Sequence, residues 1–316
     1  MLDLTIAIPT YNGEKRLPLV FEKLRSQTGT EEIAWEVLVV DNNSSDATAA
    51  IVEQFRQEWP GEIPLRYVFE KEQGLAFARE KAVTEANGEF VGFLDDDNLP
   101  TSNWVAAAYQ FGKQNPQAGA YGGCILGDFE VAPPENFGRI ASFLAIVDRG
   151  DRPLQYRVEK KILPPGAGLV VRTLAWREQV PKTLALVGRN TQKMFASEDI
   201  QVLRYIQQGG WEIWYNPAMV IYHRIPQHRL QKSYLMKLCF GVGASSYPIR
   251  MLKYPAWQRP FWVVLYGLND TRKILWYLWK HKTSIQNQTV AAVELQFLLG
   301  RLVSPCYFLF KGFPIK

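Results

Sequence analysis

Apolar and amphipathic segments alternate through the first third of the chain. The apolar segments are short, rich in β-branched residues and bounded by polar turns, as is typical of buried strands. They cover residues 4–8, 36–40, 65–69 and 90–94. The amphipathic segments repeat apolar residues at helical spacing and cover residues 15–27, 46–59, 75–86 and 104–111. This order predicts an α/β fold with a mostly parallel central sheet flanked by helices.

The alternation loosens after residue 111. Further strands are predicted at residues 120–126, 168–172 and 219–222, and a helix at residues 197–208. Prolines between residues 127 and 165 predict loops and short helices in that stretch. We therefore expect one α/β domain over residues 1–225.

From about Pro226 the chain becomes basic, aromatic and helical in pattern. Four of its ten tryptophans lie close together, at positions 257, 262, 276 and 279. The longest apolar stretch, residues 290–310, is interrupted by Glu294, Gln296, Arg301 and Pro305. It therefore falls short of the roughly 20 uninterrupted apolar residues that a spanning helix needs. We expect residues 226–316 to form a helical tail, either lying on a membrane surface or packed as a subdomain on the sheet.

Charge separates the two parts of the chain. The net charge of +5 combines 22 − 29 = −7 over residues 1–223 with 14 − 2 = +12 over residues 224–316. The basic end predicts an anionic partner, and we favour a membrane surface over nucleic acid. The three cysteines form no metal spacing, and the N-terminus shows no secretory signal. These features favour a protein on the cytoplasmic face of a membrane.

Three adjacent acids, Asp95, Asp96 and Asp97, directly follow the apolar run of residues 90–94. Adjacent carboxylates repel one another, so a cation normally offsets their charge. The ends of strands in open α/β sheets are also where ligands bind. Hard oxygen ligands suit Mg²⁺ or Mn²⁺ holding a diphosphate. The alternative is a solvated turn ended by Asn98 and Pro100.

Further polar motifs follow the other predicted strands in a fixed order. They are Pro9-Thr10-Tyr11-Asn12 after the first strand, Asp41 to Asp46 after the second, Gly74 to Arg79 after the third, and Ser197-Glu198-Asp199 at a later helix. With the acid triplet, they resemble the inverting family 2 glycosyltransferases of the GT-A fold. The resemblance covers residues 3–223. No Gly-x-Gly-x-x-Gly follows the first strand, so we do not expect a dinucleotide-dependent oxidoreductase.

The resemblance implies a donor site for a sugar nucleotide. Pro9, Thr10, Tyr11 and Asp41 would bind the base, with Asp41 accepting from an imide N–H such as that of uracil. Arg79 would contact the nucleotide or phosphate. Asp95 and Asp96 would bind ribose or metal-bound water, and Asp97 the metal. The alternatives are an Asx turn or helix cap for Asp41 and a surface ion pair for Arg79.

The resemblance also implies the acceptor side. Asp199 would be the general base, with Glu198 supporting it or binding a sugar. His223 would complete the metal shell. Independently of the resemblance, the glycines at residues 166–168 predict a tight backbone approach near the donor sugar or the acceptor, with Gly168 at the sugar, and Trp211 is positioned after two glycines to stack on a sugar face. The alternatives are helix N-terminal acids for the Glu-Asp pair, a structural histidine, a plain turn at residues 166–168 and a half-buried core tryptophan.

Together these features predict a metal-dependent inverting glycosyltransferase. It would move a sugar from a nucleotide-diphosphate donor, with a UDP-sugar favoured, to a hydroxyl of a glycan or lipid-linked acceptor, in polysaccharide biosynthesis. Two other hypotheses are a nucleotidyltransferase and a non-catalytic nucleotide-binding or membrane scaffold protein. The first usually needs a Gly-rich phosphate loop near the N-terminus, and the intact Glu198-Asp199 pair argues against the second.

Overall fold

The computed structural model describes residues 2–157, 162–186, 188, 197–282 and 284–309. The chain divides into two compact units. The first contains Met1–Asp128, Ala145–Lys182 and Val202–Arg224, and the second contains Phe129–Leu144, Thr183–Gln201 and Ile225–Lys316. The second unit therefore combines the C-terminal segment with two segments from earlier in the sequence. The domain boundary that we placed at residue 225 stays a prediction.

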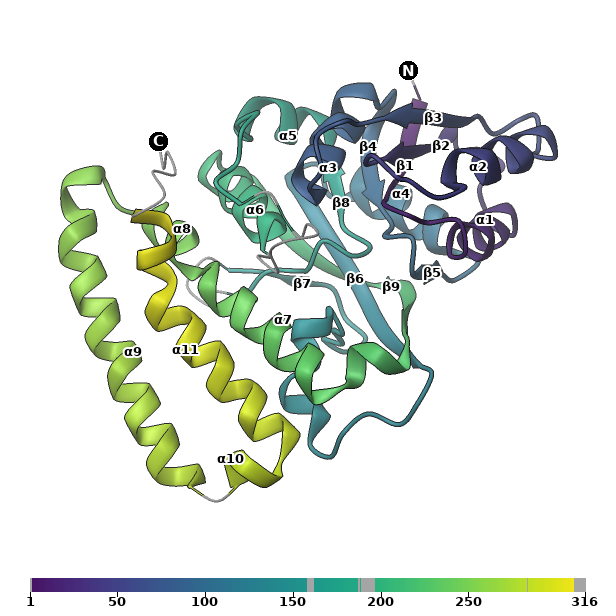
Figure 1. Ribbon diagram of the computed structural model, residues 1–316. Coiled ribbons are helices and arrows are strands. Elements are labelled where there is room, and N and C mark those ends of the chain that lie inside the picture. The colour runs from purple at the N-terminus through teal and green to yellow at the C-terminus, as the bar shows by residue number, and fades with distance from the viewer. Residues whose placement is uncertain (1, 158–161, 187, 189–196, 283, 310–316) are drawn as a thin grey trace. The chain divides into compact units, whose positions relative to one another are not determined.

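The first unit is built on one mixed sheet (Figure 1). Its strand order is β3-β2-β1-β4-β8-β6-β9-β5, with β7 paired to β9. The strands are β1 Leu2–Thr10, β2 Trp35–Asp41, β3 Leu65–Phe69, β4 Gly88–Phe93, β5 Asn98–Pro100, β6 Ala118–Phe129, β7 Leu154–Gln155, β8 Val170–Arg172 and β9 Glu212–Ile225. Strands β3, β2, β1 and β4 are parallel, whereas β8 pairs antiparallel with both β4 and β6.

Helices cover both faces of the parallel strands. These helices are α1 Leu17–Arg25, α2 Thr48–Gln57, α3 Leu75–Glu85, α4 Trp104–Gln114 and α5 Thr173–Gln179. Helices α1, α2 and α4 bury residues such as Phe21 and Trp104 in one core with Ile6 and Ile8 of β1. On the other face Phe93 of β4 meets Trp176 of α5, with 5.7 Å between ring centroids. Successive strand residues point to opposite faces, so one apolar run supplies both cores.

The second unit is helical after residue 225. Its helices are α7 Lys232–Ala244, α8 Ser246–Met251, α9 Arg259–His281, α10 Ser284–Asn287 and α11 Thr289–Leu309. Helix α11 packs between α7 and α9 (Figure 1). Helix α6, Glu198–Gln208, begins in this unit and ends in the first. Four short 3-10 helices, η1 Phe137–Arg139, η2 Ala141–Leu144, η4 Gln227–Leu230 and η5 Ala256–Gln258, complete the described structure.

The fold-class prediction is confirmed, because a central sheet is flanked by helices and a helical region follows at the C-terminus. Some elements differ from the sequence prediction. The strand expected at residues 219–222 is the much longer β9, and β5 was not predicted. The apolar stretches at residues 261–268 and 274–279 belong to the single helix α9, since no glycine or proline separates them.

Among the described helices, α11 is the one whose length and hydropathy would allow it to cross a membrane. The core helix of a soluble protein can satisfy the same criteria, and the polar contacts of α11 fit that alternative. Glu294 pairs with Arg139 and accepts from the Tyr277 hydroxyl, while Arg301 pairs with the buried Asp270. The charges that interrupt this apolar stretch are therefore satisfied inside the second unit.

Candidate active site

Three of the predicted motifs meet at one edge of the sheet: the Pro9–Asn12 motif, the motif that begins at Asp41, and the acid triplet. Strands β1, β2 and β4 are parallel neighbours, so their carboxyl ends lie together (Figure 1). Thr10 is paired with Asp41 in the register of β1 and β2. The N–H of Leu94, just before the acid triplet, donates to the carbonyl of Ala7 at 3.0 Å. Thr10, Asp41 and the triplet therefore occupy the edge at which open α/β sheets bind ligands.

Asp96 is held by side chains of the β1 loop. Its Oδ2 accepts from Thr10 Oγ1 at 2.6 Å, and Arg16 forms a two-pronged pair with it at 2.7 and 2.8 Å. Burial raises the pKa of Asp96, an effect that the Arg16 guanidinium partly opposes. The same contact raises the pKa of Arg16. Asp96 thus fastens the β1 loop to the triplet, and the role we expected for it at the ribose stays a prediction.

Asp97 lies beside His223. Residues Asn98 and His223 are paired across β5 and β9, and this brings the His223 Nε2 atom to 3.3 Å from Asp97 Oδ2. The other carboxylate oxygen of Asp97 accepts from Asn98 Nδ2 at 3.0 Å. His223 is 4% exposed, so the imidazole is fixed in place by its surroundings. Residues far apart in the sequence thereby form a carboxylate–imidazole pair at the end of β4.

The Asp97–His223 pair fits a divalent cation that takes its other ligands from elsewhere. Carboxylate and imidazole groups both serve as ligands of divalent transition metals such as Mn²⁺. Mg²⁺ is typically bound by one or two carboxylates together with substrate phosphates and water. Within the described part of the chain, no three His, Cys, Asp or Glu side chains are grouped as a metal site. A donor diphosphate or water would therefore have to complete the shell.

Arg79 reaches the triplet from α3 on the other side. Its Nη2 atom lies 3.5 Å from Asp95 Oδ1, and the guanidinium stacks 5.5 Å from the ring centroid of Phe93. A Cβ atom at Gly166 would lie 2.3 Å from Arg79 Nη2, so this position has no room for a side chain. Gly168 has φ of +65°, a conformation that favours glycine. The backbone at residues 166–168 therefore passes close to the Arg79 side chain. The sugar contact expected for Gly168 stays a prediction.

Asp41 is buried at the tip of β2 and already accepts two hydrogen bonds. Tyr67 donates its hydroxyl to Oδ2 at 2.8 Å, and the Ser44 N–H donates to Oδ1 at 2.8 Å. Burial, together with this contact, raises the pKa of Tyr67. The Asx-type contact therefore exists, and a base would use the remaining lone pairs of Asp41. Tyr11, at 38% exposure, lies accessible on the neighbouring loop.

The three other predicted site residues, Glu198, Asp199 and Trp211, come later in the chain than the acid triplet. Glu198 and Asp199 open α6 in the second unit, where Asp199 Oδ1 accepts from the N–H of Ile200 at 2.8 Å. Trp211, in the first unit, packs 5.9 Å from the Arg172 guanidinium. That contact matches the core-tryptophan alternative. The base role of Asp199 and the sugar contacts of Glu198 and Trp211 stay predictions.

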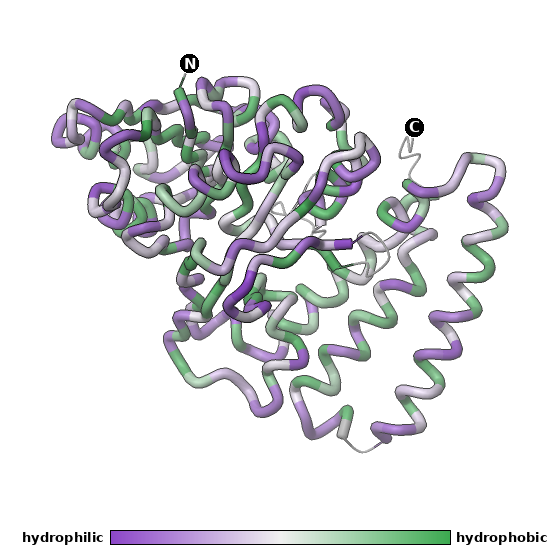
Figure 2. Tube along the Cα trace, turned by 180° about the vertical axis from the view of Figure 1, so that it is seen from behind, coloured by the Kyte–Doolittle hydropathy of each residue, from purple (hydrophilic) through white to green (hydrophobic). Residues whose placement is uncertain are grey.

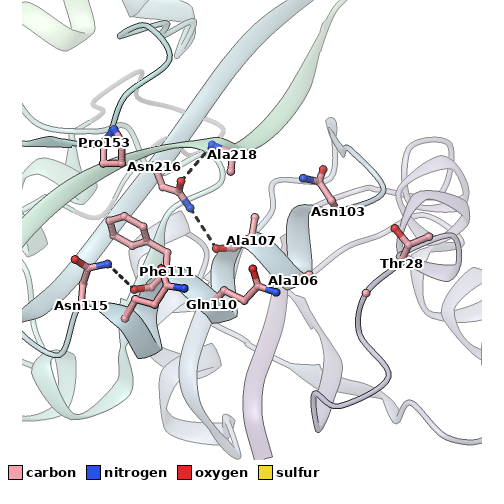
Figure 3. Close-up of a pocket in the computed structure, with 12 residues that line it drawn as sticks. Thr28, Asn103, Ala106, Ala107, Gln110, Phe111, Asn115, Pro153, Asn216 and Ala218 are labelled. Carbon is pink, nitrogen blue, oxygen red and sulfur yellow. Dashed lines mark hydrogen bonds between the residues drawn. The ribbon is translucent and has the colours of Figure 1, made fainter.

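A separate open groove of about 750 Å³ runs along α4 in the first unit (Figure 3). Among the residues that the structure describes, no charged side chain and none of the predicted site residues line it. Several of its amides are committed to the protein: Asn216 donates to the carbonyl of Ala107, and Asn115 donates to that of Phe111. This groove is therefore not part of the candidate active site.

The sequence match decides the family. Residues 5–172, more than half of the chain, match the model described as glycosyl transferase family 2. The chain belongs to this family. The match includes the β1 loop, Asp41, Arg79 and the acid triplet, and ends before His223 and the Glu198-Asp199 pair.

Several known proteins are similar to this glycosyltransferase. The uncharacterized glycosyltransferase YfnE of Bacillus subtilis is 35% identical over 103 residues, which is 32% of this chain and 25% of YfnE. The succinoglycan biosynthesis protein ExoM of Rhizobium meliloti is 24% identical over 246 residues, 77% of this chain and 73% of ExoM. The matched stretch thus spans about a quarter of one relative and most of the other.

Solved structures support the fold of this family member. The mannosyltransferase PcManGT of Pyrobaculum calidifontis, solved with GDP-Man and Mn²⁺, superposes with a TM-score of 0.63. The superposition covers 99% of this chain and 90% of PcManGT at 18% identity. The GT-A architecture predicted from the ordered motifs is confirmed.

Two residues of the site were missed by the sequence analysis. Arg16 neutralises Asp96, and Tyr67 donates to Asp41. Arg16 follows the Pro-Thr-Tyr motif closely, so its place in the β1 loop was a usable signal. Nothing in the alternation of β3 marked Tyr67 as a partner of Asp41, because that contact depends on the pairing of β2 with β3.

Proposed function

We propose that this glycosyltransferase moves a sugar from a nucleotide-diphosphate donor to a hydroxyl group, with a divalent metal and with inversion at the anomeric carbon. The observation that carries the proposal is the Asp97–His223 pair, 3.3 Å apart, at the same sheet edge as Asp41 and Arg79. A UDP-sugar is the favoured donor, because Asp41 can accept an imide N–H. The similarity to the succinoglycan biosynthesis protein ExoM supports a place in polysaccharide biosynthesis.

Asp97 and His223 would hold Mg²⁺ or Mn²⁺, in keeping with the Mn²⁺ bound by PcManGT. The bound cation would offset the negative charge that develops on the departing nucleoside diphosphate. Arg79 would add a fixed positive charge beside the diphosphate, and its burial at 4% exposure keeps water from screening that charge. Asp95 orients the guanidinium through its contact with Nη2.

Asp199 would act as the general base for the acceptor. In a single displacement, the acceptor oxygen bonds to the anomeric carbon while the bond from that carbon to the diphosphate oxygen breaks. The acceptor hydroxyl proton moves to a carboxylate oxygen of Asp199. Glu198 would either support Asp199 or bind a sugar beside it. One displacement on the face opposite the leaving group gives inversion.

The acceptor would be a glycan or a lipid-linked glycan, and the helical C-terminal region would hold the enzyme on an anionic membrane surface, on the cytoplasmic face. The charge of +12 over residues 224–316 supports this part of the proposal.

A panel of sugar nucleotides tests the proposal. Release of nucleoside diphosphate is measured for UDP- and GDP-sugars with Mg²⁺, with Mn²⁺ and with chelator, with and without glycan acceptors. We expect metal-dependent release that Asp97→Asn lowers by at least about 100-fold. Asp199→Asn should abolish transfer while donor binding persists. The exposed Asp151→Asn is the matched control and should keep full activity.

The same panel separates the other hypotheses. A nucleotidyltransferase would move the nucleoside monophosphate unit of the donor and release sugar 1-phosphate instead of nucleoside diphosphate, whereas a scaffold protein would bind nucleotide without releasing either. The proposed function would be contradicted if nucleoside diphosphate were released equally from every donor without metal, or if Asp97→Asn left the rate of release unchanged.

A further inference from the structure

Helix α9 presents an apolar stripe to solvent. Its exposed apolar residues recur at three- and four-residue spacing, which places them on one side of the helix. The residues of the stripe are Phe261, Val264, Leu265, Leu268, Leu275, Trp276 and Trp279, with exposures from 39% to 71%, while Leu278, 40% exposed, lies on the flank of the stripe. Figure 2 shows apolar positions recurring along the whole of this helix. Exposed apolar surface of this extent marks an interaction site.

The opposite side of α9 is anchored within the second unit. Asp270, Ile274 and Tyr277 are its buried residues. Asp270 pairs with Arg250 at 2.6 Å and with Arg301 at 2.7 Å, and Tyr277 donates to the carbonyl of Ala291 at 3.0 Å. These buried polar contacts fix the rotation of α9 about its own axis. The apolar stripe therefore faces away from α11 except at Trp276, which borders a pocket shared with Glu294 and Phe297 of α11.

The charges around the stripe have one sign. Arg272 lies within the stripe, and Lys273, Lys280 and Lys282 are exposed nearby. Lys280 Nζ lies 4.8 Å from the centroid of the Trp276 ring. The sole acid of α9, Asp270, is buried and paired. A second copy packed on this face would bring cations against cations, whereas anionic lipid headgroups would complement them.

We infer that α9 lies in the surface of an anionic phospholipid bilayer, with its apolar stripe among the lipids and its basic residues at the headgroups. The exposed tryptophans Trp257, Trp276 and Trp279 suit the level between headgroups and chains. Helix α11, though more apolar, would remain inside the second unit and not cross the membrane. This inference deepens the membrane-surface part of the proposed function by naming the face that binds.

Vesicle flotation of the full chain tests the inference. One set of vesicles contains phosphatidylcholine alone, and the other an equal mixture of phosphatidylcholine and phosphatidylglycerol. The protein should float with the mixed vesicles and not with the neutral ones. The double variant Leu268→Asp/Leu275→Asp should lower the partition coefficient by at least about tenfold. Leu174→Asp, at an exposed leucine of α5, is the matched control and should bind like the parent.

A second variant separates lipid charge from apolar insertion. Arg272→Gln/Lys280→Gln should lower binding to the anionic vesicles by roughly 25-fold, since each of the two basic residues near a charged surface contributes about 1 kcal/mol, or roughly fivefold. Circular dichroism establishes that each variant stays helical. Parent protein that binds no vesicles, or an α9 double variant that binds like the parent, overturns the inference.

Two further measurements show which proposal fails if the protein does not bind vesicles. Light scattering that finds a dimer, which the α9 double variant converts to a monomer while no vesicles are bound, would assign the face to a second copy. Donor turnover in the absence of lipid, measured in parallel, separates this inference from the proposed function. Turnover without flotation overturns only the inference, and flotation without turnover overturns only the activity.

Discussion

Among single residues, Glu36 is a carboxylate that the protein surrounds almost completely. It is the second residue of β2, near the end of the strand opposite to Asp41, and is 1% exposed. Its oxygens accept from Thr5 Oγ1, from both the backbone and side-chain N–H groups of Asn87, and from Arg66. Burial acts to raise the pKa of Glu36, but these hydrogen bonds outweigh it and lower the pKa below its ordinary value. Glu36 thus stabilises the sheet edge opposite the active site.

The pH dependence of stability should reveal this carboxylate. Because the pKa of Glu36 is lower in the folded chain, its contribution is fully present above the unfolded pKa and is lost as the pH falls through the folded pKa. Glu36→Gln should lower the free energy of unfolding at pH 7 by ~1–3 kcal/mol. It should also flatten the fall in stability below about pH 4.5.

Urea unfolding at pH 7 and at acidic pH measures both effects. Glu53→Gln, at an exposed glutamate of α2 that pairs with the exposed Arg56, is the control and should change little. Equal losses of stability in the two variants would contradict the role assigned to Glu36.

At this scale the sequence predicted the residue types of the site better than their partners. Asp97 and His223 were both proposed as metal ligands from ordered motifs, and β5 and β9 place them 3.3 Å apart. The salt bridge between Arg16 and Asp96 was not predicted, because it joins loops that only the parallel pairing of β1 and β4 brings together. Such pairs depend on tertiary geometry, which local patterns do not contain.

At the scale of elements, the crossing of α7 and α11 depends on two glycines. A Cβ atom at Gly243 would lie 2.2 Å from the carbonyl oxygen of Phe297, and one at Gly300 would lie 2.3 Å from that of Phe240. The two helix backbones therefore touch directly. By contrast, Gly267 in α9 has nothing within 4 Å of an added Cβ atom.

Alanine substitutions at these glycines should have opposite effects. Gly243→Ala forces the helices apart and should lower the free energy of unfolding by ~1–3 kcal/mol. Gly267→Ala removes a flexible residue from an open helix position and should raise it by up to ~1 kcal/mol. Thermal or urea unfolding of the two variants provides the comparison. A Gly243→Ala variant as stable as Gly267→Ala would show that the crossing tolerates a side chain.

The elements were predicted where periodicity was uninterrupted and missed where it was not. The predicted helix and strand starting at Leu75 and Leu65 begin where the structure has them. Strand β9 was underpredicted because Asn216 and Pro217 interrupt its alternation, although its hydrogen bonding continues through to Ile225. Short β5 carries too few residues to show a period, and is defined by pairing with β9.

At the scale of the whole molecule, the second unit draws on three separate stretches of sequence. Phe143 packs against Phe297 of α11, with 4.9 Å between ring centroids. Leu186 is buried in a cluster with Tyr247 and Met251. The segments 129–144 and 183–201 thus depend on residues after 225 to cover their apolar side chains.

Removal of the C-terminal region should therefore damage more than membrane binding. A chain ending at residue 225 would leave Phe143 and Leu186 without their apolar partners. We expect it to bind more of the dye ANS per chain than the full chain, whose α9 stripe is already exposed, and to aggregate at concentrations at which the full chain does not. Dye fluorescence and light scattering compare the two. A monodisperse truncated protein that melts cooperatively and binds no dye would contradict this dependence.

Charge distribution was readable from the sequence, but the exposed face was not. Counting gave +12 for residues 224–316 and with it the sign of the expected partner. Hydropathy singled out residues 290–310, whereas the exposed apolar stripe is on α9, which is flanked by polar positions. Burial depends on what packs against a helix, and that is decided by the folded unit.

The acid triplet itself has one more consequence. Arg16 pairs with Asp96, Arg79 contacts Asp95, and His223 lies beside Asp97, so each of the three acids has a basic side chain of the protein next to it. The two arginine guanidiniums then offset much of the mutual repulsion of the acids before any cation arrives. Newly made chains can therefore fold in a metal-poor environment, and donor and cation then bind together to a site that is already formed.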